Sequence, residues 1–191
     1  MWNTVISAAL SVLLLVQLSR AACPKTVSRA EWKAVSPVSV KNISNPVPYV
    51  VIHHTYQPPA CKTRRKCAAD MRSMQNFHMN TKQWEDIGYN FLIGGNGEVY
   101  EGRGWGVVGT HAPNYNSRSI GISFIGDYRT ELPTAEMLSL AKSMIQCGVE
   151  RGSIASDYKL IGHSQVRRTE CPGQALLNEI KKWPHWEPIK L

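Results

Sequence analysis

The stretch YVVIHH, residues 49–54, is a short apolar run that ends in two adjacent histidines. It follows Pro46-Val-Pro48, and its four leading residues predict a buried β-strand. A second run of this kind, residues 158–161, leads into the segment GHSQVRRTECPG, residues 162–173. We therefore expect two strands that each deliver a histidine at their end.

Further strand and helix patterns alternate around these two runs. Helices are indicated by apolar residues at three- and four-residue spacing, and a Gly-rich turn at 94–97 predicts a β-hairpin. The expected strands are 89–93, 98–100 and 119–125, and the expected helices are 68–79, 133–147 and 173–183. This alternation predicts an α/β fold in which a central mixed β-sheet is flanked by three α-helices.

The N-terminus has the pattern of a secretory signal peptide. Its apolar run, residues 5–18, is too short to span a bilayer, and small residues follow it. We expect a signal peptide at residues 1–21 and a single domain at 22–191, which is a usual length for one domain. No other apolar run approaches spanning length, so we expect a secreted, extracellular protein without a membrane span.

The chain is basic, with a formal charge of +8 that falls to +7 when Arg20 leaves with the signal peptide. A basic secreted protein favours anionic surfaces, bacterial walls among them. The basic residues are scattered except at Lys62–Lys66, and no aromatic-basic pattern indicates a nucleic-acid partner.

The five cysteines are expected to form two disulfides and to leave one thiol unpaired. They are Cys23, Cys61, Cys67, Cys147 and Cys171. In an oxidising compartment cysteines pair, but five cannot all pair within one chain. Cys61 and Cys67 are close enough to close a small loop. The count alone leaves open which of the other three stays unpaired.

One candidate for the unpaired thiol lies beside a histidine. Cys171 comes eight residues after His163, in a turn with Pro172 and Gly173. If the two strands are neighbours, His53 or His54, His163 and Cys171 can converge, and two histidines with one cysteine form a known catalytic zinc site. The alternative is that the histidines at the strand ends are simply hydrogen-bonded.

Five segments form a collinear pattern that covers the chain from about Ser28 to His185. They are VIHHT (51–55), DIGYNFLIGGNGEVYEGRGW (86–105), THAPNYN (110–116), SIGISFIG (119–126) and GHSQVRRTECPG (162–173). This pattern resembles the peptidoglycan recognition proteins, a family that is similar to bacteriophage N-acetylmuramoyl-L-alanine amidases. The resemblance implies a central sheet with three helices and a groove for a muropeptide.

The resemblance also implies a catalytic site. It assigns His53, His163 and Cys171 to a Zn²⁺ ion, Tyr89 to catalysis, and Thr169 to a polar position near the metal. Receptors of the family without enzymatic activity commonly have serine in place of Cys171, so the ligand set here is complete. It further implies the disulfides Cys61–Cys67 and Cys23–Cys147. The expected activity is cleavage of the amide between the lactyl group of N-acetylmuramic acid and L-alanine, in innate immunity; the alternative is a binding-only receptor for peptidoglycan.

The substrate-binding residues follow from the resemblance as well. They are His54, Thr55, His78, Lys82, Gln83, Trp84, Arg103, His111 and Asn116. For His54 and Thr55 the alternative is a hydrogen-bonded core pair, and for His78 it is packing at a helix boundary. Trp84 and Arg103 favour diaminopimelate-type peptidoglycan, because arginine can bind the extra carboxylate in a bidentate pair. Gln83 departs from the glycine that the family has beside such a tryptophan. Trp105, Trp183 and Trp186 are expected to be packing residues.

Overall fold

The apolar run at residues 49–54 lies in a long central strand, β2 (Val47–His54). The computed structural model describes residues 23–189, so the expected signal peptide at 1–21 lies outside the described residues. Strand β2 lies between β5 (Ser119–Phe124) and β6 (Ile154–Gly162) and is parallel to both. The two strands that end in histidines are therefore neighbours, as the convergence of their side chains requires.

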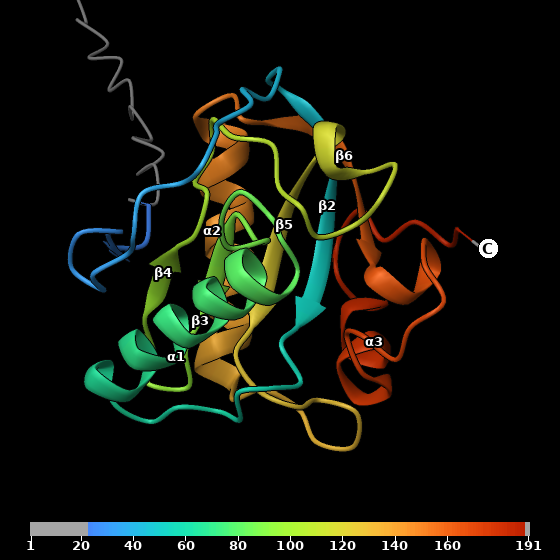
Figure 1. Cartoon of the computed structure of the whole chain (residues 1–191). Helices are drawn as coiled ribbons and strands as arrows, with labels where there is room; N and C mark the ends of the chain where they lie inside the picture. Colours follow the sequence, from blue (N-terminus) through green and yellow to red (C-terminus); the bar gives the residue numbers. More distant parts are fainter. Residues whose placement is uncertain (1–22, 190–191) are drawn as a thin grey trace, which may run out of the picture.

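The sheet has six strands in the order β1-β4-β3-β5-β2-β6 (Figure 1). Strands β3 (Phe91–Ile93) and β4 (Val99–Glu101) form the expected antiparallel hairpin, and β1 (Thr26–Val27) pairs with β4 in parallel. Strand β3 is parallel to β5. The sheet is thus mixed, which confirms the fold class expected from the alternation of elements.

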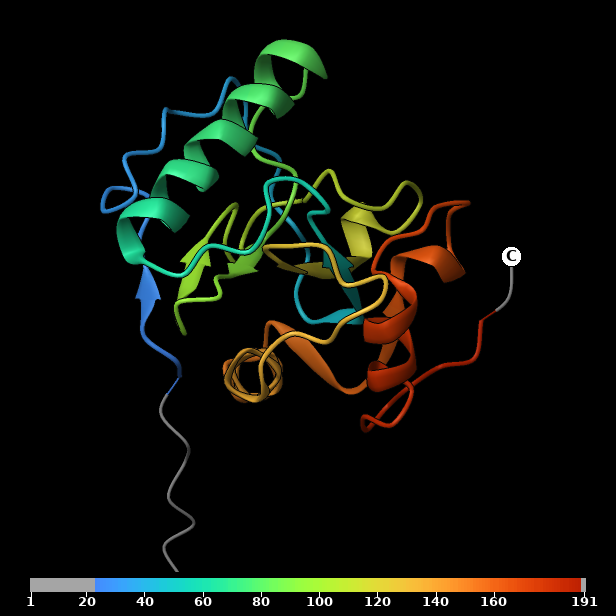
Figure 2. The ribbon, with the colours of Figure 1, turned by 90° about the horizontal axis from the view of Figure 1, so that it is seen from below.

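Helices cover both faces of this sheet. Figure 2 shows α1 (Arg64–Asn76) above the sheet and α2 (Ala135–Glu150) below it, with α3 (Gln174–Ile180) on the side of β6. The largest hydrophobic core contains apolar side chains of α2 and α3, and a second core contains those of α1. Helix α1 begins four residues earlier than expected because the Thr63 hydroxyl accepts a hydrogen bond from the Lys66 amide. Helix α3 ends at Ile180, three residues earlier than expected.

The alternation of side chains along β2 directs His53 to the face that α1 covers. Val50 and Ile52 belong to the core shared with α2 and α3, so His53 points to the opposite face. On that face His53 is opposite Ser123 of β5, and Ser123 is opposite Leu92 of the α1 core. His53 therefore reaches the carboxyl end of three parallel strands, where ligands bind in sheets of this kind.

Two disulfides fix segments outside the sheet. Cys23–Cys147 ties the N-terminal segment to α2, and Cys61–Cys67 ties the loop before α1 to its first turn. Both agree with the pairing that the resemblance implied, and Cys171 is the free thiol. Trp183 is buried, and Trp105 and Trp186 pack against the largest core, which confirms their expected packing role. Within residues 23–189, no helix has the length and apolar character needed to cross a membrane.

Candidate metal centre and groove

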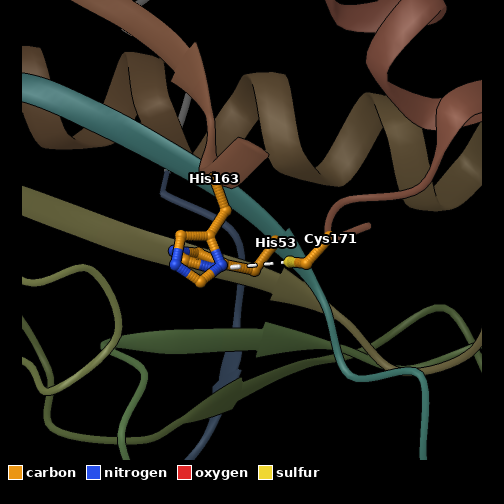
Figure 3. A group of neighbouring side chains, drawn as sticks. All are labelled: His53, His163 and Cys171. Atoms are coloured by element: carbon orange, nitrogen blue, oxygen red, sulfur yellow. Dashed lines mark hydrogen bonds between the residues drawn. The ribbon is translucent and has the colours of Figure 1, made fainter. Parts of the chain in front are cut away.

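His53, His163 and Cys171 meet at the carboxyl ends of β2 and β6. Figure 3 shows the three side chains pointing toward one another: His53 comes from β2, His163 follows β6, and Cys171 lies in the loop before α3. One ligand atom from each lies within 4.8 Å of the others, and the His53 Nδ1 atom is 3.6 Å from the Cys171 sulfur. The structure thus brings together the three residues expected to hold a metal.

The donor chemistry of this cluster fits zinc. The Nε2 atom of His163 is buried and has no hydrogen-bond partner among residues 23–189. Burial lowers the pKa of His163 to about 4 and holds that of His53 well below its ordinary value, so both imidazoles are neutral, the form that binds a metal. Burial raises the pKa of the Cys171 thiol to about 12, so metal binding would have to displace its proton.

Tyr89 lies beside the cluster on the α1 side. Its ring centroid is 5.3 Å from that of His53, and it contributes to the walls of three adjoining cavities. Burial raises the pKa of its phenol well above the ordinary value of 10.0. Tyr89 therefore remains protonated at neutral pH and can donate a hydrogen bond.

Thr169 shapes the loop that carries Cys171. Its hydroxyl accepts a hydrogen bond from the Cys171 amide at 3.2 Å, and the residue lines both cavities next to the cluster. Glu170, the carboxylate adjacent to Cys171, has a side chain that is 78% exposed and pairs with Arg129 at 3.2 Å, and the residue also lines the cavity beside Cys171. Thr169 thus has a structural role in this loop, whereas Glu170 is mostly exposed and forms part of the cavity wall.

A groove runs across the cluster. It consists of a cavity of about 340 Å³ beside His54 and Cys171 and one of about 620 Å³ that extends toward Trp84 and Asn116, and the two share Tyr89, His163 and Thr169. Tyr89 also borders a cavity of about 470 Å³ that includes His78. At the other end, Thr110 and Asn116 border a cavity of about 460 Å³ that includes Arg103. Such a groove is long enough for an extended ligand with several polar groups.

His54 and Thr55 line the groove but are held by internal hydrogen bonds. The Nδ1 atom of His54 accepts a hydrogen bond from the Tyr128 amide at 3.0 Å, and burial lowers the pKa of His54 to about 4. The Thr55 hydroxyl donates to the Pro58 carbonyl and accepts from the Gly126 amide. His54 and Thr55 are thus internally hydrogen-bonded residues that also border the groove, so the two alternatives given for them do not exclude each other.

A π-helical turn after α1, Phe77–Thr81, places His78 against Trp84. The two rings stack with centroids 4.6 Å apart, and the His78 Nδ1 atom accepts a hydrogen bond from the Gly88 amide. Trp84 and Lys82 line the larger cavity. His78 is thus both a packing residue and a wall of the groove.

Gln83 does not line these cavities. Its side chain is exposed and donates a hydrogen bond to the Asn80 carbonyl, and its φ angle is 57°. A φ in the left-handed region costs a residue with a side chain free energy that glycine does not incur. This backbone conformation gives a physical reason for the glycine that the family has beside the tryptophan.

Arg103 is half-buried and binds backbone carbonyls. Its guanidinium donates to the carbonyls of Ile87 at 2.7 Å, Val108 at 2.9 Å and Asp86 at 3.4 Å. Of the five N–H donors of an arginine, these bonds use three, so one on each terminal nitrogen has no partner among residues 23–189, and Arg103 lines a cavity.

His111 and Asn116 act together in the loop before β5. The Asn116 side-chain oxygen accepts hydrogen bonds from the amides of His111 and Ala112, each at 2.8 Å. The His111 ring is buried and its Nδ1 atom is 2.9 Å from the His53 Nε2 atom. Burial lowers the pKa of His111 to about 3. Both residues line the groove, and the contact of His111 with His53 was not expected from the sequence.

Several residues of the site were missed at the level of sequence. Thr110, Pro113 and Arg167 line the larger cavity, Tyr56 lines the smaller one, and Ser123 lies opposite His53 in the sheet. Arg167 could have been found from its place in the same segment as His163 and Thr169. Ser123 could have been found from strand alternation only after the pairing of β2 with β5 was known.

The sheet and the cluster at its edge define an amidase-type domain. A family model described as N-acetylmuramoyl-L-alanine amidase matches residues 43–174. Peptidoglycan-recognition protein LB of Drosophila melanogaster is 51% identical over 168 residues, which cover 88% of this chain and 72% of that protein. A peptidoglycan recognition protein of Bombyx mori is 44% identical over 182 residues, 95% of this chain and 91% of that protein. The chain belongs to the peptidoglycan recognition protein family.

Solved structures agree with this assignment. Wild-type Drosophila PGRP-LB superposes with a TM-score of 0.86 at 51% sequence identity, over 87% of this chain and 98% of that chain. Drosophila PGRP-LB has also been solved as a mutant in complex with tracheal cytotoxin, and PGRP-LE in complex with the same compound, described as monomeric diaminopimelic acid-type peptidoglycan. The PGRP-LE structure is 44% identical, with a TM-score of 0.84, and covers 86% of this chain and 96% of that chain.

Proposed function

We propose that this protein is a zinc-dependent N-acetylmuramoyl-L-alanine amidase that binds bacterial peptidoglycan and acts in innate immunity. Its substrate bond is the amide between the lactyl group of N-acetylmuramic acid and L-alanine. We further propose that the protein is secreted after removal of residues 1–21 and that residues 22–191 form its single domain.

The observation that carries this proposal is the convergence of three zinc-type donors at the floor of a groove. Two neutral imidazoles and one unpaired thiol come from separate elements and leave room for a further ligand on the side of the groove. Catalytic zinc sites have this composition, with three protein ligands and one open position. A binding-only receptor has no need for a free thiol beside two histidines.

The reaction adds water across the amide. A C–O bond forms at the lactyl carbonyl, the C–N bond breaks, and the amino group of L-alanine takes up a proton. Zinc held by His53, His163 and Cys171 would supply Lewis acidity, which lowers the pKa of bound water toward about 7 and polarises the carbonyl.

The residues around the cluster have separate tasks in this reaction. Tyr89 is a neutral phenol at the groove and donates a hydrogen bond to the carbonyl oxygen as that oxygen becomes negative. Thr169 holds the Cys171 loop through its hydroxyl and borders both cavities next to the reacting bond.

The proposed substrate is peptidoglycan with diaminopimelate in the stem peptide. Two N–H donors of Arg103 have no partner within the described part of the chain, and a pair of donors suits the extra carboxylate of diaminopimelate. The complexes of two family members with tracheal cytotoxin support this choice. His54, Thr55, His78, Lys82, Trp84, His111 and Asn116 form the walls that would contact the muropeptide.

The test is digestion of purified muropeptides by the zinc-loaded protein, followed by mass spectrometry of the products. We expect release of intact stem peptides that begin with L-alanine, loss of release with a chelator, and recovery when zinc is returned. Diaminopimelate-type and lysine-type substrates are compared in parallel. Binding of muropeptide without any release of stem peptide from either substrate would refute the amidase and favour the receptor.

A further inference from the structure

The ring of His53 has a different partner on each nitrogen. Its Nδ1 atom faces the Cys171 sulfur at 3.6 Å, and its Nε2 atom faces the Nδ1 atom of His111 at 2.9 Å. A neutral imidazole carries one proton, so only one of its nitrogens is free to bind a metal. If Nδ1 of His53 binds the metal, the ring proton must be on Nε2. The atom that faces Nε2, here Nδ1 of His111, must then be a hydrogen-bond acceptor.

We propose that His111 is a positioning residue that holds His53 in its Nε2–H tautomer, so that the Nδ1 atom is free for the metal. This inference rests on the proposed zinc site but not on the proposed hydrolysis. The Nδ1 atom of His111 accepts the hydrogen bond and therefore has no proton, and the His111 proton is on Nε2, a buried atom without a hydrogen-bond partner among residues 23–189. A partner that fixes the tautomer and orientation of a ligating histidine strengthens metal binding.

The fold holds the His111 ring at this place from two sides. On one side, the two backbone hydrogen bonds to Asn116 fix the main chain at His111. On the other, the ring packs against Gly121 of β5, where a Cβ atom would lie 2.6 Å from ring carbons of His111. Any side chain at position 121 would collide with the His111 ring. Glycine at this position therefore leaves the space that the ring occupies.

This space is tied to the strand that carries the ligand. Gly121 pairs with Val51 of β2, two residues before His53, and its amide donates to the Asn90 side chain at 2.9 Å. The contact between the two histidines thus depends on the register of the sheet and is present without a substrate. If His111 served only to bind the muropeptide, its ring would not need to lie against the His53 ring.

The alternative is that both rings have the opposite tautomer, with the proton of each histidine on Nδ1. If His111 donated from Nδ1 to the His53 Nε2 atom, the proton of His53 would be on Nδ1 and would point at the Cys171 sulfur. Zinc could then bind His53 only after both rings had exchanged their protons. The ¹⁵N chemical shifts of the two rings distinguish these states directly.

The experiment measures zinc affinity and ring protonation without any substrate. Zinc affinity is determined by competition with a chromophoric chelator for the wild type, His111→Leu and His111→Asn. We expect His111→Leu to bind zinc about 10- to 100-fold more weakly. His111→Asn keeps an oxygen acceptor near the position of Nδ1 and should recover much of the loss. Arg118→Gln, a change in the same loop at a residue that stacks on Tyr115, should bind zinc as the wild type does.

Two further measurements keep the inference falsifiable where a variant folds poorly. In the zinc-loaded wild type, ¹⁵N spectra should show His53 protonated at Nε2 and His111 unprotonated at Nδ1; the reverse pattern would overturn the proposal. With Co²⁺ in place of zinc, the visible spectrum should change in His111→Leu and be restored in His111→Asn. Equal affinities and equal spectra for all variants would also overturn it. A protein that binds zinc in this way but releases no stem peptide would refute the amidase and leave this inference standing.

Discussion

The His53 Nδ1 atom lies 3.6 Å from the Cys171 sulfur although the two residues are 118 positions apart in the chain. The sulfur also approaches the backbone amide of His54 at 3.4 Å, so the thiol is held against the end of β2 from two directions. Replacement of the Cys171 sulfur therefore removes one metal ligand, while β2 still holds His53 in place.

Cys171→Ser should abolish hydrolysis and leave muropeptide binding nearly intact. A serine hydroxyl is a much poorer zinc ligand than a thiolate, and the walls of the groove are formed mainly by other residues. Metal content by mass spectrometry, stem-peptide release and muropeptide binding by calorimetry check this together. Glu170→Gln, whose side chain is mostly exposed, is the control and should keep its zinc. Hydrolysis by the zinc-free serine variant would disprove a role for the metal.

Tyr89→Phe should lower kcat by roughly 10²- to 10³-fold with little change in KM, because it removes one hydrogen-bond donor to the developing oxyanion. The aromatic ring stays in place, so the walls of the groove and the zinc content should not change. Steady-state kinetics on a defined muropeptide measure both constants. A wild-type kcat in this variant would remove Tyr89 from the reaction.

Arg103→Lys should reduce the preference for diaminopimelate over lysine substrates by about tenfold. Lysine keeps the charge but lacks the planar pair of N–H donors that fits a carboxylate. The same variant assayed on lysine-type substrate serves as the internal control for any weakening of the Ile87 and Val108 backbone contacts. If both substrates lose activity equally, Arg103 supports the fold and does not select the stem peptide.

The free energy of unfolding should fall as the pH drops from about 6.5 to 4, in part because of His78. Burial lowers the pKa of His78 from 6.5 to about 4, so the unfolded chain takes up a proton in this window and the folded chain does not. The stability that His78 contributes is complete above pH 6.5 and is lost toward pH 4, with an upper limit of about 3 kcal/mol.

Urea denaturation of the metal-free protein at a series of pH values measures this dependence. His78→Asn keeps an acceptor for the Gly88 amide and does not titrate, so its curve should be flatter than that of the wild type. Parallel curves for the two proteins would show that His78 does not respond to pH in this range.

The sheet could be predicted from sequence to the extent that its strands have a local signal. The runs at 49–54 and 119–125 and the hairpin around Gly94–Gly97 lie where the pattern placed them. The pairing of β2 with β6 could not be predicted, because no local pattern determines which of several buried strands will be neighbours. The metal ligands depended on that pairing, so the resemblance to a family was needed to identify His53.

The contact of His111 with His53 is a second feature that could not be predicted from the sequence. It depends on how the loop after β4 folds over β5 and on the space above Gly121, neither of which has a period or motif in the sequence. Gln83 provides a third: only its φ angle of 57° gives a physical reason for glycine at this position. Distances of this kind arise from tertiary packing, which sequence patterns do not encode locally.

The burial of Cys171 has a consequence for how the chain reaches its oxidised form. Thiol–disulfide exchange proceeds through the thiolate, and a thiol with a pKa of about 12 is almost entirely protonated at neutral pH. Once β2 and the loop before α3 are together, Cys171 is therefore slow to attack Cys23–Cys147 or Cys61–Cys67. Before these segments come together, Cys171 can form disulfides with any of the other four cysteines. The order of folding and oxidation therefore decides whether Cys171 is the cysteine that remains a free thiol beside His53 and His163.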